Sequence, residues 1–257
     1  MNPTLPLNNK TVLVTRPKEL AEPLLHRINQ AGGIALHYPV MRIGNVKDSA
    51  TLDNIIDHLP DFDIAVFISP TAVRKTLGKI AALPDKLALA VIGRSTEAML
   101  KKHRLVADIV PEGFDTESLL QHPALQPDRL ADKAVVIFRG EGGRDLLAGT
   151  LAERGAKVTY AETYRREKNS LDSLDLDTLL QLDALTVTSN QTLQYLYELT
   201  EEDCKSTLTT LPLIVPGSRA YALALQLGFQ HIIQADNATD DACLRALICY
   251  FSQRQHN

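Results

Sequence analysis

The amino-acid sequence predicts an α/β protein built from parallel sheets, and three observations support that class. Short runs of apolar and β-branched residues recur along the chain, with helical stretches between them. The runs are apolar on both faces, which is typical of parallel strands that crossover helices cover on each side. Several strand-and-turn segments also occur twice, which indicates a duplicated unit.

The stronger runs are expected to be strands because each combines β-branched residues with a turn or helix start directly after it. They are residues 11–15, 64–69, 87–93, 134–138, 184–189 and 213–215. Weaker strands are expected at residues 34–38, 107–110, 157–160 and 231–234. About ten strands are too many for one twisted open sheet, so more than one sheet is expected.

Self-comparison shows how the chain is duplicated. Residues 11–33 resemble residues 134–155, since each segment has a strand, an arginine after it, a helix with a Leu-Leu pair and a closing glycine. Residues 63–69 resemble residues 183–189 and also run on into a second strand and helix. The pattern predicts two parallel-sheet domains of flavodoxin-like size. Two tandem domains, or one domain inserted into the other, are equally compatible with it.

Length and charge restrict the classes of function. The 257 residues suffice for one large domain or two small ones, and a hydrophobic content of 45% excludes a disordered chain. The 27 basic and 31 acidic residues give a formal charge of −4, so no bulk attraction to nucleic acid or to an anionic membrane is expected. Apolar runs such as residues 64–68 are too short to span a bilayer, and the start of the chain lacks a signal-peptide core, so we expect a cytoplasmic protein.

Cofactor and metal motifs are missing from the sequence. Gly140-Glu141-Gly142 follows a strand, but the dinucleotide fingerprint requires a further glycine where Asp145 stands. The chain has no phosphate-binding loop motif and no nucleophile-elbow serine. Its histidines and cysteines follow neither metal-ligand nor disulfide spacing. We therefore expect no metal, flavin, nucleotide or pyridoxal cofactor.

Polar residues gather where the expected strands end. In doubly wound sheets, ligands bind beyond the carboxyl ends of the strands, where helix N-termini supply free N–H groups for anionic oxygens. Hydroxyl, glycine and arginine residues follow the strands in Thr15-Arg16-Pro17, Ser69-Pro70-Thr71, Gly93-Arg94-Ser95-Thr96, Arg139-Gly140-Glu141-Gly142-Gly143-Arg144, Ser189-Asn190 and Pro216-Gly217-Ser218-Arg219. Helix capping is the simpler interpretation of any one position. Together these segments favour a site for an anionic ligand.

These segments, in this order, resemble the uroporphyrinogen-III synthase family. The resemblance spans nearly the whole chain and depends on order and spacing, because each motif is only a strand end with its turn. Its motifs are Val12-Leu-Val-Thr-Arg-Pro, Phe67-Ile-Ser, Val91-Ile-Gly-Arg-Ser-Thr, Phe138-Arg-Gly-Glu-Gly-Gly-Arg, Thr163-Tyr-Arg-Arg, Val187-Thr-Ser-Asn and Val215-Pro-Gly-Ser-Arg. The sequence departs from the family pattern at Ile68, where threonine is more frequent, and in the order of the Pro216-Gly217 turn.

The resemblance implies that the second domain is inserted into the first. Residues 1–38 with 167–257 would then form the first domain and residues 44–161 the second, with residues 39–43 and 162–166 as linker strands. A substrate cleft is expected between the two domains.

The resemblance also implies a cofactor-independent lyase. The family cyclises hydroxymethylbilane to uroporphyrinogen III with loss of water and inversion of the terminal pyrrole ring. Tyr164 matches the tyrosine that is proposed to assist departure of the hydroxyl group, a role open to a phenol that stays protonated at neutral pH. The expected ligands of the substrate are Thr15, Arg16, Ser69, Gly93, Arg94, Ser95, Thr96, Arg139, Gly140, Ser189, Gly217 and Ser218.

The expected partners follow from this activity. They are the small-molecule substrate and, transiently, the preceding or following pathway enzyme, with no nucleic acid or membrane, and we expect a monomer. A competing interpretation is a non-catalytic, two-lobed module that binds a small anionic metabolite, for which the same turns would serve.

Overall fold

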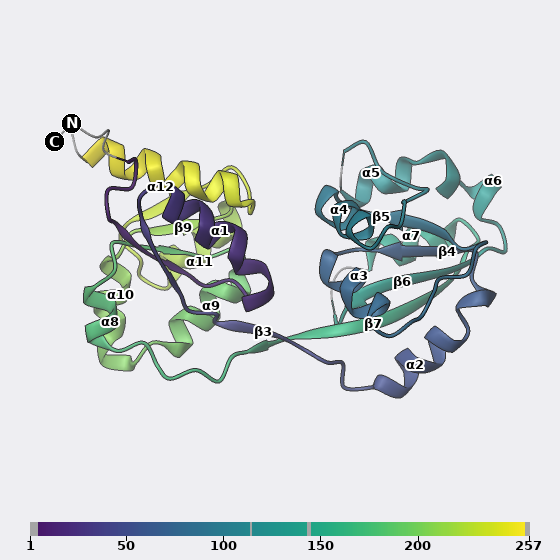
Figure 1. Ribbon diagram of the computed structural model, residues 1–257, viewed down its shortest axis with the longest axis horizontal. Coiled ribbons are helices and arrows are strands. Elements are labelled where there is room, and N and C mark those ends of the chain that lie inside the picture. Colours follow the sequence, from purple (N-terminus) through teal and green to yellow (C-terminus); the bar gives the residue numbers. More distant parts are fainter. Residues whose placement is uncertain (1–4, 114, 143–144, 255–257) are drawn as a thin grey trace. The chain divides into compact units, whose positions relative to one another are not determined.

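The computed structural model describes residues 5–113, 115–142 and 145–254, and the chain divides into two compact units. Unit 1 comprises Met1–Arg42 and Glu167–Asn257, and unit 2 comprises Ile43–Arg166. Each unit contains one five-stranded sheet, labelled in Figure 1. The predicted fold class, with two small parallel sheets, is confirmed.

Unit 1 has a parallel sheet in the order β10-β9-β8-β1-β2. Its strands are β1 (Thr11–Val14), β2 (Ile34–His37), β8 (Ala184–Thr186), β9 (Leu213–Val215) and β10 (Ile232–Gln234). Its helices are α1 (Lys18–Gln30), α8 (Leu176–Leu180), α9 (Asn190–Leu199), α10 (Lys205–Thr210), α11 (Ser218–Gln226) and α12 (Asp240–Arg254). Val12 and Val14 pack with α1 and α12, whereas Leu13 packs with α8 to α11. Helices therefore cover both faces of this sheet, as the apolar strands predict.

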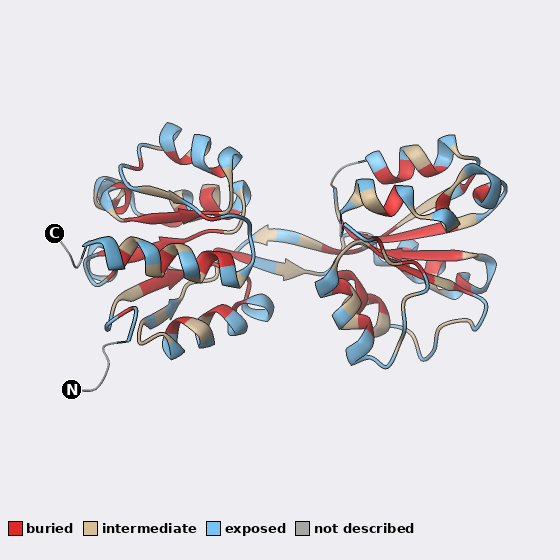
Figure 2. Ribbon diagram, turned by 90° about the horizontal axis from the view of Figure 1, so that it is seen from above, coloured by how far each residue is buried: buried red, intermediate tan, exposed pale blue. Residues whose placement is uncertain are grey.

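Unit 2 has its sheet in the order β3-β7-β6-β4-β5. The strands are β3 (Met41–Gly44), β4 (Ile64–Phe67), β5 (Ala88–Val91), β6 (Ala134–Gly140) and β7 (Lys157–Lys168), of which β4 to β7 pair in parallel. The helices are α2 (Ser49–Asp57), α3 (Pro70–Leu77), α4 (Arg94–Lys102), α5 (Thr116–Gln121), α6 (Pro127–Leu130) and α7 (Leu146–Glu153). One core cluster lies under α2 to α4 and another under α5 to α7. Figure 2 shows the buried strands within each unit and the exposed outer faces of the helices.

One expected strand is absent from the described part of the chain. Residues 107–110 form only an isolated bridge between Ala90 and Ile109, so the prediction of a strand there is wrong. The Asp108 carboxylate accepts a hydrogen bond from the backbone N–H of Leu89 at 2.8 Å. This N–H group of β5 is therefore bound to a side chain and not to the backbone of a further strand. Pro111, close behind, has no N–H to extend a ladder.

The two sheets follow the same plan once this bridge is counted. Beside β5, Ile109 occupies the place that β10 occupies beside β9. Strands β8, β9, β1 and β2 then correspond to β4, β5, β6 and β7, with Val12 opposite Ala184 in one sheet and Val135 opposite Ile64 in the other. The segments that resemble each other in sequence therefore occupy equivalent positions.

An aspartate and a lysine hold each central strand pair at its amino end. The Asp183 carboxylate accepts hydrogen bonds from Thr11 N and from Lys10 Nζ, each at 2.8 Å. In unit 2, the Asp63 carboxylate accepts bonds from Ala134 N and Lys133 Nζ, each at 2.9 Å. We call these two sets the strand clamps. The clamp fixes the register, because it joins the first residues of two neighbouring strands.

Candidate functional site

The expected site residues fall in both units, at the carboxyl ends of strands. Unit 1 contains Thr15, Arg16, Ser189, Gly217 and Ser218, and unit 2 contains Ser69, Gly93, Arg94, Ser95, Thr96, Arg139, Gly140 and Tyr164. Gly143 and Arg144, in the same strand-end segment as Arg139, lie outside the described residues.

In unit 2, Tyr164 and Ser69 form a polar cluster with Arg166. The Tyr164 side chain belongs to the core, and the residue is only 2% exposed. Its Oη lies 3.1 Å from Ser69 Oγ and accepts a hydrogen bond from Arg166 Nη2 at 3.2 Å. The Arg166 guanidinium also lies over the phenol ring, 5.6 Å from its centroid. Ser69 and Tyr164 are expected site residues, and Arg166 stands in the Thr163-Tyr-Arg-Arg motif without a predicted role.

Ser69 is placed by the start of α3. It is the residue before the helix, and its Oγ accepts a hydrogen bond from Ala72 N at 3.1 Å. This N-cap is the role that a serine after a strand predicts. Because β4 ends at Phe67, two residues earlier, Ser69 lies at the carboxyl end of a central strand. Its side chain is partly exposed.

A β-bulge sets the direction of Tyr164. In the β6–β7 pair, Arg139 lies opposite Glu162, but Gly140 lies opposite Tyr164, so Thr163 is an extra residue on β7. The Thr163 hydroxyl donates to the Arg139 carbonyl at 3.0 Å, and both Thr163 and Tyr164 are buried. The extra residue turns Tyr164 to the sheet face that Ala161 occupies in the same core cluster. Strand alternation in the sequence gives no sign of such an insertion.

Gly140 makes room for the phenol ring. A Cβ atom at this position would lie 2.7 Å from both Cε2 and Cζ of Tyr164. Gly140, one of the expected substrate ligands, therefore also determines the space that is available to the neighbouring ring.

Arg139 is buried, with an exposed fraction of 4%, and its guanidinium contacts groups of the same unit. Its Nε donates to Gly140 O at 3.3 Å and its Nη2 donates to Gly142 O. It lies 4.4 Å from the Tyr160 ring centroid and forms an ion pair with Asp145 at 3.5 Å. These contacts join Gly142 and Asp145 to the end of β6.

Tyr160 joins the same group of side chains. Its hydroxyl donates to Asp145 Oδ1 at 3.1 Å. Partial burial, and to a lesser degree this hydrogen bond, raise the pKa of Tyr160 above its usual value. The phenol therefore remains neutral at physiological pH.

Residues Gly93 to Thr96 form the other strand-end segment of unit 2. Gly93 is the N-cap of α4, and Arg94 and Ser95 are exposed in its first turn. Thr96 is buried, with an exposed fraction of 2%. The exposed first turn could present N–H and hydroxyl donors to an anion, whereas the Thr96 hydroxyl could not without rearrangement.

In unit 1, the Thr15 hydroxyl is tied to the sheet. It is fully buried and donates to Thr186 O at 2.7 Å, while the Thr186 hydroxyl donates to Leu13 O at 2.9 Å. These reciprocal bonds cross-link β1 and β8 beyond their ladder. The hydroxyl of Thr15, an expected substrate ligand, is therefore already engaged in a structural hydrogen bond.

Ser189, Gly217 and Ser218 lie at two helix starts of unit 1. Ser189 forms a capping box with Thr192 at the start of α9. Gly217 is the N-cap of α11, and Ser218 is exposed in its first turn. Asn190 Nδ2 donates to Arg219 O at 3.4 Å, which brings the two helix starts together.

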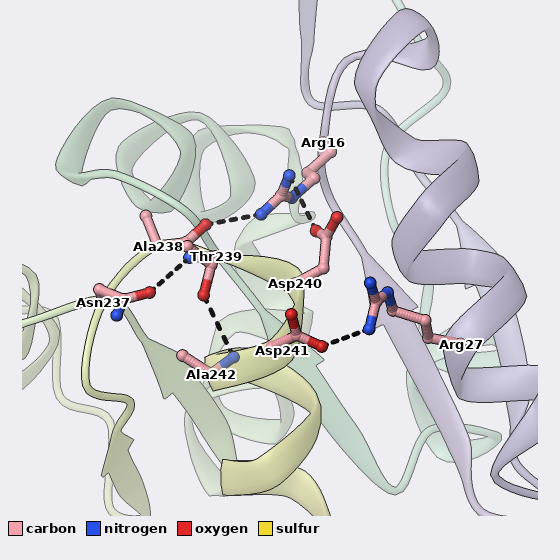
Figure 3. Close-up of polar contacts among 8 residues, drawn as sticks. All are labelled: Arg16, Arg27, Asn237, Ala238, Thr239, Asp240, Asp241 and Ala242. Carbon is pink, nitrogen blue, oxygen red and sulfur yellow. Dashed lines mark hydrogen bonds and ion pairs between the residues drawn. The ribbon is translucent and has the colours of Figure 1, made fainter. Parts of the chain in front are cut away.

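Arg16 is bound to the start of α12 (Figure 3). Its Nη2 donates to Ala238 O at 2.7 Å, and its Nη1 forms an ion pair with Asp240 at 3.0 Å. The next acidic residue, Asp241, forms an ion pair with Arg27 of α1. Asp240 is not among the site residues expected from the sequence, although an acidic pair at a helix start is a recognisable signal.

A metal site or a membrane-spanning helix would indicate a different class of protein. Within residues 5–113, 115–142 and 145–254, no three His, Cys, Asp or Glu side chains come together as a metal site. No helix in the same ranges is long and apolar enough to cross a membrane.

The structure defines a class of α/β protein with two largely parallel sheets. Hydroxyl groups, arginines and the starts of helices lie near the carboxyl ends of their strands. The family model described as uroporphyrinogen-III synthase HemD matches residues 22–245. The chain belongs to the uroporphyrinogen-III synthase family, whose members are enzymes of tetrapyrrole biosynthesis, and the family expected from the sequence is thus confirmed.

Individual relatives support the assignment. Uroporphyrinogen-III synthase of Escherichia coli (strain K12) is 34% identical over 249 residues, which cover 92% of this chain and 99% of that protein. The same enzyme of Salmonella typhimurium is 33% identical over 248 residues, with the same coverage.

Solved structures share the fold. A mutant uroporphyrinogen III synthase from the extremely thermophilic bacterium Thermus thermophilus covers 95% of this chain and 99% of its own, with 18% identity and a TM-score of 0.58. Uroporphyrinogen-III synthetase from Helicobacter pylori 26695 covers 94% of this chain and 99% of its own, with 15% identity and a TM-score of 0.58.

Proposed function

We propose that this protein cyclises hydroxymethylbilane to uroporphyrinogen III, with loss of water and inversion of the terminal pyrrole ring. The observation that carries the proposal is the 34% identity to the Escherichia coli enzyme over almost the full length of both chains. The Ser69–Tyr164–Arg166 cluster adds protic groups at the carboxyl end of a parallel sheet, where such folds bind ligands.

The reaction asks little covalent chemistry of the protein. The electron-rich pyrrole ring expels the hydroxyl group, and the resulting azafulvene is attacked by the substituted carbon of the terminal pyrrole. The protein must assist departure of the hydroxyl, hold the reactive conformer and prevent closure without inversion. Neutral hydrogen-bond donors suffice for the first task, and we propose that Tyr164 contributes to it.

The carboxylates of the substrate require several separate donors. We propose that they bind to the strand ends of both units, at Thr15, Arg16, Ser69, Gly93, Arg94, Ser95, Thr96, Arg139, Gly140, Ser189, Gly217 and Ser218. The helix starts at Ser95 and Ser218 support this best, because both residues are exposed in the first turn of a helix. The buried hydroxyl of Thr15 supports it least.

We further propose that the functional domains are residues 1–38 with 167–257, and residues 44–161, with residues 39–43 and 162–166 as linkers. The protein would act in the cytoplasm as a monomer without a cofactor. Besides its substrate it would contact only the preceding or following pathway enzyme, and neither nucleic acid nor membrane.

The test is an incubation with hydroxymethylbilane, followed by oxidation of the products and separation of the isomers. We expect the type III isomer in excess of the type I isomer that forms without an enzyme. Activity should survive extensive dialysis against a chelator. A product that is only type I would contradict the proposal and favour a module that binds a small anionic metabolite.

A further inference from the structure

The direction of the hydrogen bonds in the Ser69–Tyr164–Arg166 cluster decides which hydroxyl group can act on a ligand. Two bonds have a fixed direction, because Ala72 N donates to Ser69 Oγ and Arg166 Nη2 donates to Tyr164 Oη. Either hydroxyl could be the donor in the 3.1 Å contact between Ser69 and Tyr164. If Tyr164 donates, the Ser69 proton is left to point outward, and if Ser69 donates, the Tyr164 proton is left over.

Burial favours Tyr164 as the donor. Tyr164 is 2% exposed and Ser69 is partly exposed, so a surplus proton on Tyr164 would be shielded from water while one on Ser69 could reach water or a ligand. Acidity favours the same direction, because a phenol is a stronger donor and a weaker acceptor than an alkyl hydroxyl. The positive charge of Arg166 on the phenol oxygen strengthens Tyr164 as a donor.

From this polarity we infer that Ser69, instead of binding a carboxylate, is the catalytic residue that donates to the departing hydroxyl of the substrate, and that Tyr164 and Arg166 are positioning residues that act through Ser69. The inference rests on the proposed function. Gly140 and the bulge at Thr163 maintain the arrangement, because they fix the place of the Tyr164 ring.

The proton transfers balance over the whole reaction. As the C–O bond of the substrate breaks, its electron pair moves to the oxygen, which takes the Ser69 proton and leaves as water. Ser69 takes the Tyr164 proton in the same step, and Arg166 stabilises the phenolate. The proton released when the terminal pyrrole regains its aromaticity at ring closure returns to Tyr164 through solvent.

A double-mutant cycle tests the order of action. We expect Ser69→Ala to lower kcat about a hundredfold and Tyr164→Phe about tenfold, with KM within about threefold of the parent in both. Adding Tyr164→Phe to Ser69→Ala should cause no further loss, since Tyr164 would act only through Ser69. A Tyr164→Phe loss that is as large in the Ser69→Ala background as in the parent would overturn the inference.

Two further variants separate catalysis from folding. Ser69→Thr retains a hydroxyl and should keep kcat within about threefold of the parent. Asp115→Ala removes a comparable N-cap, from α5 of the same unit, and should lower the melting temperature like Ser69→Ala while leaving kcat within about twofold. Equal kcat losses in Ser69→Ala and Asp115→Ala would assign Ser69 to folding alone and contradict the inference.

Arg166→Gln covers the case in which Ser69→Ala does not fold. Arg166 is exposed, so its loss should leave the fold intact. We expect kcat to fall severalfold in the parent and to stay unchanged in a Tyr164→Phe background. An equal fall in both backgrounds would show that Arg166 does not act through Tyr164.

The tyrosine doublet in the Raman spectrum gives a readout that does not depend on activity, because its intensity ratio separates donor from acceptor phenols. The Tyr164 signal, obtained by difference from Tyr164→Phe, should indicate a phenol that both donates and accepts in the parent and one that only accepts, from Arg166, in Ser69→Ala. A pure acceptor in the parent would contradict the inference. If the parent makes only the type I isomer, the proposed function fails, and the Raman result still decides the direction of the bond.

Discussion

The two units of the chain are alike at the amino ends of their sheets and differ at the carboxyl ends. At the amino ends, Asp183 and Asp63 form the same strand clamp with a lysine and a backbone N–H. At the carboxyl ends, Arg16 and Arg139 stand at equivalent positions, Arg16 just beyond β1 and Arg139 near the end of β6. Arg16 binds the start of α12, whereas Arg139 binds the turn that follows its own strand.

This difference separates the requirements of the fold from those of the site. Strand register depends on the amino-end clamp, which both units retain. The carboxyl end is where a ligand is expected, and among the described residues only unit 2 has a buried phenol there with a serine and an arginine on its oxygen. Arg16 and Arg139 each contact groups of their own unit, but their partners differ.

The largest expected effect comes from replacing the two equivalent arginines. Arg139→Met should lower the free energy of unfolding by about 3 kcal/mol, because it removes the hydrogen bonds and ion pair of a buried guanidinium and leaves the buried Gly140 carbonyl without this donor. Arg16→Met should cost about 1.5 kcal/mol, since Asp240 keeps the favourable field of the α12 N-terminus. Urea unfolding of each variant measures both values.

Arg129→Met is the matched control for these two substitutions. Its ion pair with Asp128 joins side chains that are 74% and 75% exposed, so stability should change by less than about 0.5 kcal/mol. Equal losses for Arg16→Met and Arg139→Met would remove the proposed distinction between the carboxyl ends.

Replacing the clamp aspartates should have a smaller and unit-specific effect. Asp183→Ala and Asp63→Ala should each cost about 1 kcal/mol, a value already reduced for solvent screening of the partly exposed lysine pairs.

The cysteines at positions 204, 243 and 249 all lie in unit 1, and burial raises the pKa of Cys243 to about 12. Thiol labelling of Cys243 therefore reports the opening of unit 1.

We expect Asp183→Ala to speed Cys243 labelling about fivefold, because a loss of about 1 kcal/mol in the free energy of unfolding raises the open population by that factor. Asp63→Ala should leave the labelling rate within about twofold of the parent. Labelling of the exposed Cys249 serves as the internal standard for reagent reactivity. Equal acceleration by both substitutions would mean that the two units open together.

The smallest expected effect is the pH dependence of the Asp63 clamp. Hydrogen bonds from Lys133 and from Ala134 N hold the pKa of Asp63 below its usual value. Its contribution to stability is therefore complete above about pH 5 and disappears as the pH falls through the lowered pKa. In acid urea titrations, the stability difference between the parent and Asp63→Ala should shrink to zero. A constant difference down to about pH 2 would show that the carboxylate charge contributes nothing.

The sequence predicts the elements whose signal is local. Strands such as residues 134–138 and the N-caps Ser69 and Ser189 follow from apolar runs with a capping residue behind them. The Thr163 bulge leaves no local signal, because any residue can be the extra one in a strand. The partners of Arg16 lie more than 220 positions away, with Ala238 at a separation of 222, so they depend on how the whole unit closes. At residues 107–110 the local signal predicts too much, because this apolar run forms only the bridge between Ile109 and Ala90.

The pairing of β1 with β8 also bears on the order of events during synthesis. Thr11 and its clamp partner Asp183 are 172 positions apart, whereas every strand pair among β4 to β7 lies within unit 2. At about 5–20 residues per second, a ribosome needs about 9–34 s to synthesise the chain from Thr11 to Asp183, directly before β8. During that interval unit 2 can complete its sheet, while β1 and β2 present an open, apolar edge. We therefore expect the first forty or so residues to be the segment of the nascent chain that chaperones protect.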